Sequence, residues 1–250
     1  MTYRLHYLII FCILHSLGSF SQTILLEENV IGDTIIPTFG PNMKNYFHFY
    51  VGYGMILGPD EVGSEINYGR SYDVAVGALY KRKVNNNYAI GMDLLIHQTS
   101  FNLKQDTAKF LPNDSTHKNE KLIFYNLSLG LFNRINYGKR GNYMGNYVDV
   151  GVRIDWPFSV VHFTKDKYPV ATANNGRTVR TRTSALLFTE ALNYSIYARM
   201  GFTRYVLTAS YRLSDVFVKD AEVYQQYGRN IDTYPELPAL VVGVEISLYW

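Results

Sequence analysis

Apolar and polar residues alternate one by one through most of the chain after residue 46. From Phe47 to Leu57 every second residue is apolar, and His48, Gly52 and Gly54 are among the residues between. A period of two predicts a β-strand with one apolar and one polar face. The pattern recurs at residues 72–81, 90–97, 123–131, 148–156, 192–199, 204–213 and 240–250. We therefore predict an all-β fold with eight strands.

The links between these strands are alternately long and short. The long links are residues 58–67, 103–120, 157–183 and 214–236, and the short links are residues 82–87, 136–142 and 200–201. A transmembrane β-barrel shows this alternation because its periplasmic turns are short and its extracellular loops are longer. A soluble sandwich is the alternative. It has no reason to alternate its links, and the Gly, Ser and Asp residues on the polar faces would form a poor hydrophobic core.

The first 21 residues have the layout of a secretory signal peptide. Arg4 precedes an apolar run from Leu8 to Leu14, and Ser19 and Ser21 occupy the small-residue positions before a cleavage site. The run is too short to cross a bilayer, which needs about 20 residues. We expect residues 1–21 to be removed, residues 22–45 to form a periplasmic tail or plug segment, and residues 46–250 to form the barrel.

The last predicted strand ends in alternating apolar residues and an aromatic residue. Its candidate insertion signal is Val244, Ile246, Leu248 and Trp250. In this and in its strand pattern the chain resembles the small eight-stranded outer-membrane β-barrels of Gram-negative bacteria, of the OmpA transmembrane type. The Ser-Gln after the signal core and the loops rich in Asn, Tyr and Lys resemble Bacteroidota examples. One departure is that Glu245 stands where that pattern expects glycine, and Gly243 lies two places upstream.

The resemblance implies an eight-stranded antiparallel up-and-down transmembrane β-barrel in the cell outer membrane. Its partners would be outer-membrane lipid and lipopolysaccharide, with the barrel-assembly machinery acting during insertion. The composition fits this expectation, because 18% of residues are charged, below the roughly 25% of soluble domains. A net charge of +3 is too small for a strongly basic nucleic-acid-binding protein. The single cysteine lies in the signal segment and no metal-ligand spacing is present, so we expect no cofactor.

The polar faces of the predicted strands carry charged residues that would point into the lumen. These residues are Asp73, Asp93, Asp149, Arg153, Asp155, Arg204, Arg212 and Glu245. Eight strands enclose a lumen about wide enough for side chains to fill. Ionised groups in such a low-dielectric space must pair. We therefore expect a salt-bridged plug that closes the barrel, and a narrow conducting pore is the alternative.

The long links differ in charge. The link at 157–183 contains Arg177, Arg180 and Arg182 in one short run, and arginine binds phosphate through two parallel hydrogen bonds. This run predicts contact with lipopolysaccharide phosphates. A solvated loop, or ion pairing with the acidic link at 214–236, is the alternative. The acidic link also carries Phe217, Tyr224, Tyr227 and Tyr234, which indicate either a protein contact or packing across the barrel mouth.

A lipid-modifying enzyme would need an activated nucleophile near the outer leaflet. His162, Ser159 and Asp166 are the one loop cluster of suitable residue types, but they lie in a long link and we predict no catalytic site there. We expect a non-enzymatic structural or interaction barrel, such as an accessory subunit of an envelope secretion or assembly complex with an envelope protein partner. A lipid- or lipopolysaccharide-modifying enzyme and a small-solute channel are the alternatives. Glu190, on the lipid-facing side of its strand, requires either a place beyond the hydrocarbon edge or a β-bulge.

Overall fold

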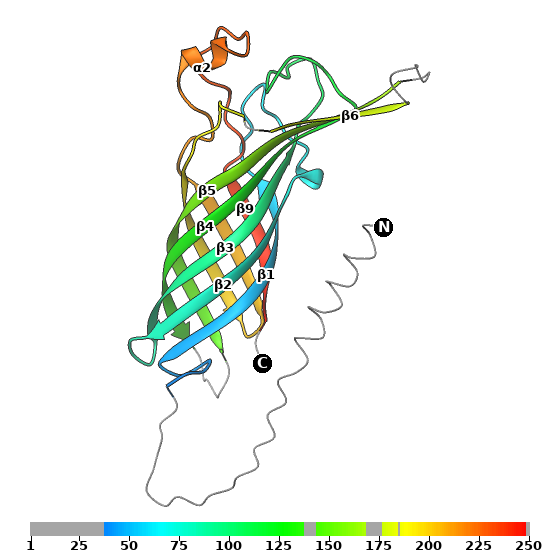
Figure 1. The fold of residues 1–250 in the computed structure, drawn as a ribbon. Helices are drawn as coiled ribbons and strands as arrows, with labels where there is room; N and C mark the ends of the chain where they lie inside the picture. The colour runs from blue at the N-terminus through cyan, green and yellow to red at the C-terminus, as the bar shows by residue number, and fades with distance from the viewer. Residues whose placement is uncertain (1–37, 138–143, 169–176, 185, 249–250) are drawn as a thin grey trace, which may run out of the picture. The chain divides into compact units, whose positions relative to one another are not determined.

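The computed structural model describes residues 38–137, 144–168, 177–184 and 186–248, and eight of its strands close into an antiparallel barrel (Figure 1). Each barrel strand pairs with the next, and the last pairs with the first. The barrel strands are β1 (Asn45–Leu57), β2 (Tyr72–Lys83), β3 (Tyr88–Asn102), β4 (Asn119–Tyr137), β5 (Asn146–Lys167), β7 (Asn193–Phe202), β8 (Tyr205–Arg212) and β9 (Leu240–Leu248). The predicted eight-stranded barrel is thus confirmed.

The outer surface of the barrel is apolar and exposed. Along β5, for example, every second residue from Val150 to Trp156 points outward, and these side chains are 52–59% exposed. A continuous apolar ring of this kind is the surface that hydrocarbon covers in a transmembrane barrel. On β4 the ring runs from Tyr125 to Ile135 and is interrupted by Asn133, whose side chain accepts a hydrogen bond from the Tyr88 hydroxyl.

The barrel has two different ends. The short-turn end carries the links at 84–87, 138–145 and 203–204, and the long-loop end carries the others. The long-loop end includes a 3-10 helix, η1 (Tyr68–Arg70), and a short helix, α2 (Ala221–Gln225). Among the described residues, no helix is long and apolar enough to cross a membrane.

One strand lies outside the barrel and corrects the prediction for residues 157–183. There β5 continues to Lys167, and β6 (Thr178–Ser184) pairs with the segment of β5 from Val161 to Lys167. The two strands form a hairpin that leaves the long-loop end, and we call it the arm (Figure 1). Pro157 does not end the strand because it lies at a register shift between β4 and β5, where proline is tolerated.

The register shift changes which residues of β5 lie on the inward side, from odd-numbered to even-numbered positions. Asn126 pairs with Pro157 and Tyr125 with Ser159, so Phe158 is an extra, unpaired residue of the kind found in a β-bulge. Before the bulge, odd-numbered residues such as Asp149 point into the barrel. After it, even-numbered residues such as His162 share a face with the buried side of β4.

The interior contains three apolar clusters. The cluster at the short-turn end consists of Tyr46, Met144, Tyr147 and Val206. The middle cluster consists of Tyr50, Ala75, Leu79, Leu95, Phe132 and Tyr197. The largest cluster lies at the long-loop end and joins strand ends to loop residues such as Phe188, Phe217 and Tyr234. We call the loops that build it, residues 58–71, 103–118, 186–192 and 213–239, the cap.

The ends of the chain are described only in part. Residues 1–37, and with them the expected signal peptide, lie outside the described residues, and so does Trp250 of the expected insertion signal. Residues 38–44 contact the short-turn end, where the Lys81 ammonium donates a hydrogen bond to the carbonyl of Pro41 at 2.6 Å. Val244, Ile246 and Leu248 are 42–47% exposed on the outer face of β9. Glu190 lies in the cap, before β7, which places it beyond the apolar ring.

Candidate functional site

Six charged side chains meet in the middle of the barrel, and we call them the central network. They are Asp93, Arg134, Asp149, Arg153, Arg199 and Glu245. Each points inward because it lies on the side of its strand opposite the exposed apolar residues. Three arginines face three carboxylates, so the formal charges cancel when all six are ionised, as buried ions require.

The contacts in the central network are short and shared. The guanidinium of Arg134 binds Asp149 with both arms, Nε to Oδ1 at 2.7 Å and Nη2 to Oδ2 at 2.8 Å. Arg199 bridges the carboxylates, with Nε 3.2 Å from Asp149 Oδ2 and Nη1 3.1 Å from Asp93 Oδ2. Asp93 also accepts hydrogen bonds from Arg153 at 3.2 Å and from the Tyr50 hydroxyl at 2.7 Å. The network therefore joins strands on opposite sides of the barrel.

Aromatic rings fill the space around these ions. The Arg134 guanidinium lies 3.5 Å from the ring centre of Tyr147, and those of Arg153 and Arg199 lie 4.4 and 5.1 Å from Tyr197. Such cation–π contacts gain strength when the cation is removed from water. A cavity beside the network measures only about 40 Å³, little more than the volume of one water molecule. The side chains close the lumen at this level.

The structure places the eight residues predicted in the lumen at four different levels. Asp93, Asp149, Arg153 and Glu245 belong to the central network, Asp73 and Asp155 lie nearer the cap, and Arg212 binds cap carbonyls. Arg204 is a correction. It lies in the two-residue turn between β7 and β8 and is exposed, because the strands end at Phe202 and Tyr205.

Two central arginines escaped the sequence prediction. Arg134 lies beyond residue 131, where the predicted strand ends, and Arg199, the last residue of the predicted strand at 192–199, is not among the residues predicted in the lumen. The signal that would have found Arg134 is the period of two itself. Extended past Leu131, it places Arg134 on the same inward side as Phe132.

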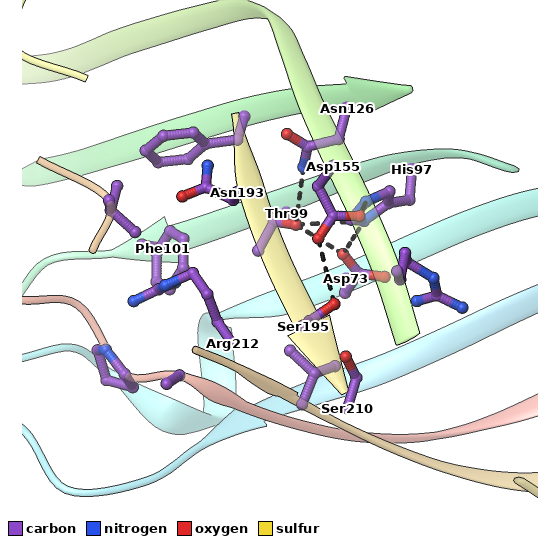
Figure 2. Close-up of a pocket in the computed structure, with 16 residues that line it drawn as sticks. Asp73, His97, Thr99, Phe101, Asn126, Asp155, Asn193, Ser195, Ser210 and Arg212 are labelled. Carbon is purple, nitrogen blue, oxygen red and sulfur yellow. Dashed lines mark hydrogen bonds and ion pairs between the residues drawn. The ribbon is translucent and has the colours of Figure 1, made fainter. Parts of the chain in front are cut away.

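A second polar cluster lies between the central network and the cap (Figure 2). The His97 ring contacts Asp73 Oδ2 through Nδ1 at 2.8 Å, and Ser128 Oγ through Nε2 at 3.0 Å. Asp155 Oδ1 lies 3.6 Å from the same Nε2, and Thr99 donates a hydrogen bond to Asp73 at 2.7 Å. A cavity of about 100 Å³ adjoins the cluster, and Ser195 and Arg212 also line it.

The connectivity Ser128–His97–Asp73 is that of a serine hydrolase triad, but its surroundings argue against that chemistry. Ser128 is 1% exposed and does not line the cavity, so a substrate cannot reach its hydroxyl. Asp155 approaches the nitrogen that would accept the serine proton. The contacts instead link residues of β2, β3, β4 and β5. Nor do His, Cys, Asp and Glu side chains form a metal-binding group anywhere in the described part of the chain.

The structure does not bring the candidate residues His162, Ser159 and Asp166 together. His162 Nε2 lies 2.7 Å from Glu120 Oε1, and Asp166 Oδ2 lies 2.8 Å from His117 Nδ1. Ser159 lies on the other face of β5 from both. These residues stabilise the base of the arm and do not form a nucleophile.

Buried carboxylates tie the cap to the barrel rim. Glu120 accepts contacts at 2.8 Å from both Lys109 and Gln105, in addition to the one from His162. Burial raises its pKa, but these hydrogen bonds outweigh burial, and the pKa of Glu120 falls below its usual value. Glu236 accepts hydrogen bonds from the backbone of Val216, and there burial prevails and raises the pKa of the carboxyl.

Aromatic side chains of the acidic link pack across the barrel mouth, which is one of the two expected arrangements. Phe217, Tyr224 and Tyr234 are at most 2% exposed. The ring of Tyr234 lies edge-on to Phe217 at 5.6 Å and to Tyr224 at 5.0 Å. Tyr227 is 42% exposed. These rings pack the cap onto the ends of the barrel strands.

The arginines of the basic run lie in the arm. Arg180 and Arg182 are exposed on β6, and Arg177 is exposed just before it. None of the three forms an ion pair with a carboxylate of the described residues. The alternative of ion pairing with the acidic link is not seen among the described residues, where Glu236 contacts Arg212 and Asp215 contacts Lys219.

Comparisons with known proteins add little. No protein-family model matches this chain, and no curated protein matches it. A search of solved structures finds similarity to Ail, the attachment invasion locus protein of Yersinia pestis, crystallised with the heparin analogue sucrose octasulfate. The two chains are 12% identical, with a TM-score of 0.29, over 82% of this chain and 96% of that one. Likeness of this size says nothing about what this chain binds.

Proposed function

We propose that this protein is a closed outer-membrane β-barrel that anchors a folded cap and arm at the cell surface. Its role is structural or interactive, and it is not enzymatic. The observation that carries the proposal is the combination of an apolar outer ring with a lumen filled by paired ions. Hydrocarbon covers the apolar ring, and the paired ions in the lumen leave no path for solutes. The short-turn end faces the periplasm and the long-loop end faces outward, as in other barrels of this type.

The two alternatives need features that the described residues lack. A channel needs a continuous polar passage, whereas the central network and the cap each obstruct the lumen. A lipid-modifying enzyme needs a nucleophile at the outer leaflet, whereas the Ser128 hydroxyl is buried inside the barrel. The cap and the arm remain as the surfaces on which a partner can bind.

We further infer that the barrel is an accessory subunit of an envelope secretion or assembly complex, of the OmpA transmembrane type found in Bacteroidota. The cap supports this inference, since a barrel that only fills the membrane has no need of a packed outer layer. Val62 and Leu187 are 79% and 62% exposed on the cap and offer apolar contacts to an envelope protein. The barrel-assembly machinery would insert the chain, with its terminal strand as the signal.

Cysteine labelling of intact cells tests the orientation. The single native cysteine lies at position 12, in the expected signal peptide, so each variant carries one reactive thiol once that segment is removed. Val62→Cys lies on the cap and Asn86→Cys in the turn between β2 and β3, and both positions are exposed. A membrane-impermeant maleimide should label the first variant in intact cells and the second only after lysis. The reverse pattern, or a protein that is soluble without detergent, refutes the proposal.

Two further measurements separate the roles. Planar-bilayer recordings of the purified barrel should show no conductance steps, and regular steps would favour the channel. Mild-detergent purification from outer membranes should recover a stoichiometric envelope protein. Recovery of the lone barrel would refute the accessory-subunit role while leaving the orientation intact.

A further inference from the structure

The arm carries its positive charge on one face. The register of β5 and β6 places Lys165 directly opposite Arg180, and Phe163 opposite Arg182. Directly opposed residues of an antiparallel pair point to the same side of the sheet. Lys165, Arg180 and Arg182 therefore share one face of the arm.

This basic face continues the lipid-facing surface of the barrel. On β4, Lys121 pairs with Phe163, which extends the basic face by one strand. Lys121 lies on the same side of β4 as Tyr125, which follows it by four residues and begins the apolar ring on this strand. Its ammonium lies 5.9 Å from the ring centre of Tyr72, which stacks on Tyr53 in the outer surface. The basic face thus adjoins the aromatic residues at the edge of the apolar outer surface of the barrel.

The acidic groups of the arm are on its other face. Glu120 and Asp166 have the opposite parity, and they contact His162 and His117 there. None of Lys121, Lys165, Arg180 and Arg182 forms an ion pair with a carboxylate of the described residues. Lys165 and Arg180 are like charges in directly opposed positions, an arrangement that destabilises a sheet unless an anion lies between them.

We propose that this face binds the phosphate groups of outer-leaflet lipid, as lipopolysaccharide carries them. The inference rests on the proposed orientation of the barrel, which brings the face to the level of the lipid headgroups. Arginine on the exposed edge strand supplies paired hydrogen-bond donors that match phosphate oxygens. Lys121 and Lys165 supply point charges nearer the barrel wall.

The variant Arg180→Gln/Arg182→Gln removes the two arginines of this face. Both side chains are exposed on β6, so the barrel and cap contacts are unchanged. The matched control is Lys104→Gln/Lys219→Gln, which removes two cap cations that already have carboxylate partners, Glu65 and Asp215. A third variant, Arg180→Lys/Arg182→Lys, keeps the charge and loses the bidentate geometry.

Binding is measured by titrating the detergent-solubilised full-length protein with lipopolysaccharide, with chemically dephosphorylated lipopolysaccharide and with inorganic phosphate. A basic residue near an anionic membrane surface contributes about fivefold in affinity, so the double glutamine variant should bind lipopolysaccharide about thirtyfold more weakly. The control should bind like the unaltered protein, and the lysine variant should lie between them. Dephosphorylated lipopolysaccharide should bind no better to the unaltered protein than to the glutamine variant.

Several outcomes overturn the inference. If the glutamine and control variants bind lipopolysaccharide equally well, the basic face takes no part in binding. If the unaltered protein binds dephosphorylated and intact lipopolysaccharide equally well, the phosphates take no part. Competition by inorganic phosphate at millimolar concentration would indicate a site for the free ion. The orientation of the barrel is tested separately, by the labelling of Val62→Cys and Asn86→Cys, so an error in the proposed orientation can be told apart from an error in this inference.

Discussion

Replacing Arg134 by methionine should destabilise the barrel strongly, because it leaves a carboxylate buried with too little positive charge. Arg134 and Asp149 have fully buried side chains and share two hydrogen bonds of 2.7 and 2.8 Å. Without Arg134, Asp149 keeps one contact with Arg199, at 3.2 Å. Removing one partner of a buried ion pair costs about 3–5 kcal/mol. Because the stability of a folded protein is about 5–15 kcal/mol, a loss of this size is easily measured.

The matched double variant Arg134→Met/Asp149→Leu tests the electrostatic reasoning. It takes the network from three cations and three carboxylates to two of each, so the charges still cancel. The double variant should therefore be more stable than Arg134→Met alone, since an ion pair can be exchanged for apolar groups at little cost. Urea unfolding in lipid vesicles, followed by tryptophan fluorescence, gives the free energies. A double variant that loses the sum of the two single losses, or a single loss below about 1 kcal/mol, would refute the reasoning.

Three further predictions concern the wall and the cap. Val150→Arg, on the lipid-facing side of β5, should cost about 2–4 kcal/mol of unfolding free energy in vesicles, whereas Val62→Arg on the cap should change it little. Gly151→Ala should destabilise the barrel by about 1–3 kcal/mol, because a Cβ there would lie 2.3 Å from a β4 carbonyl oxygen, while Gly69→Ala has open space. The lowered pKa of Glu120 stabilises the cap above pH 4.5, its usual pKa, and this contribution is lost as the pH falls through the lower folded value. Relative to its rate on an unfolded substrate at the same pH, pepsin should thus cut residues 103–118 increasingly fast below pH 4.5, and Glu120→Gln should remove that dependence; a relative rate unchanged with pH would contradict it.

The barrel could be predicted from the sequence because each strand has one face in contact with hydrocarbon and one in contact with the lumen. That contrast imposes a period of two, visible in segments such as Val148–Trp156. It also predicted that Asp93, Asp149 and Arg153 point inward, since inward parity follows from the apolar neighbours alone. The alternation of short and long links followed from the two different ends of the barrel.

The arm and the pairing partners could not be predicted in this way. Phe158 adds one residue to β5, and the pattern then loses its phase, so the segment after Pro157 resembled a loop. Arg134 follows an outward polar residue, Asn133, which ended the apparent alternation too early. Which arginine meets which carboxylate depends on the stagger between strands, and a single sequence carries no direct record of that stagger.

The bulge at Phe158 takes up one residue of β5 without changing the side on which later residues lie. Asn126 pairs with Pro157 and Tyr125 with Ser159, so a chain that lacked Phe158 would alternate regularly there and keep these pairs. Lys165 would then keep its place on the basic face, and His162 and Asp166 would keep theirs on the opposite face. A change of one codon in length at this position would therefore leave the arm's charge on its present side.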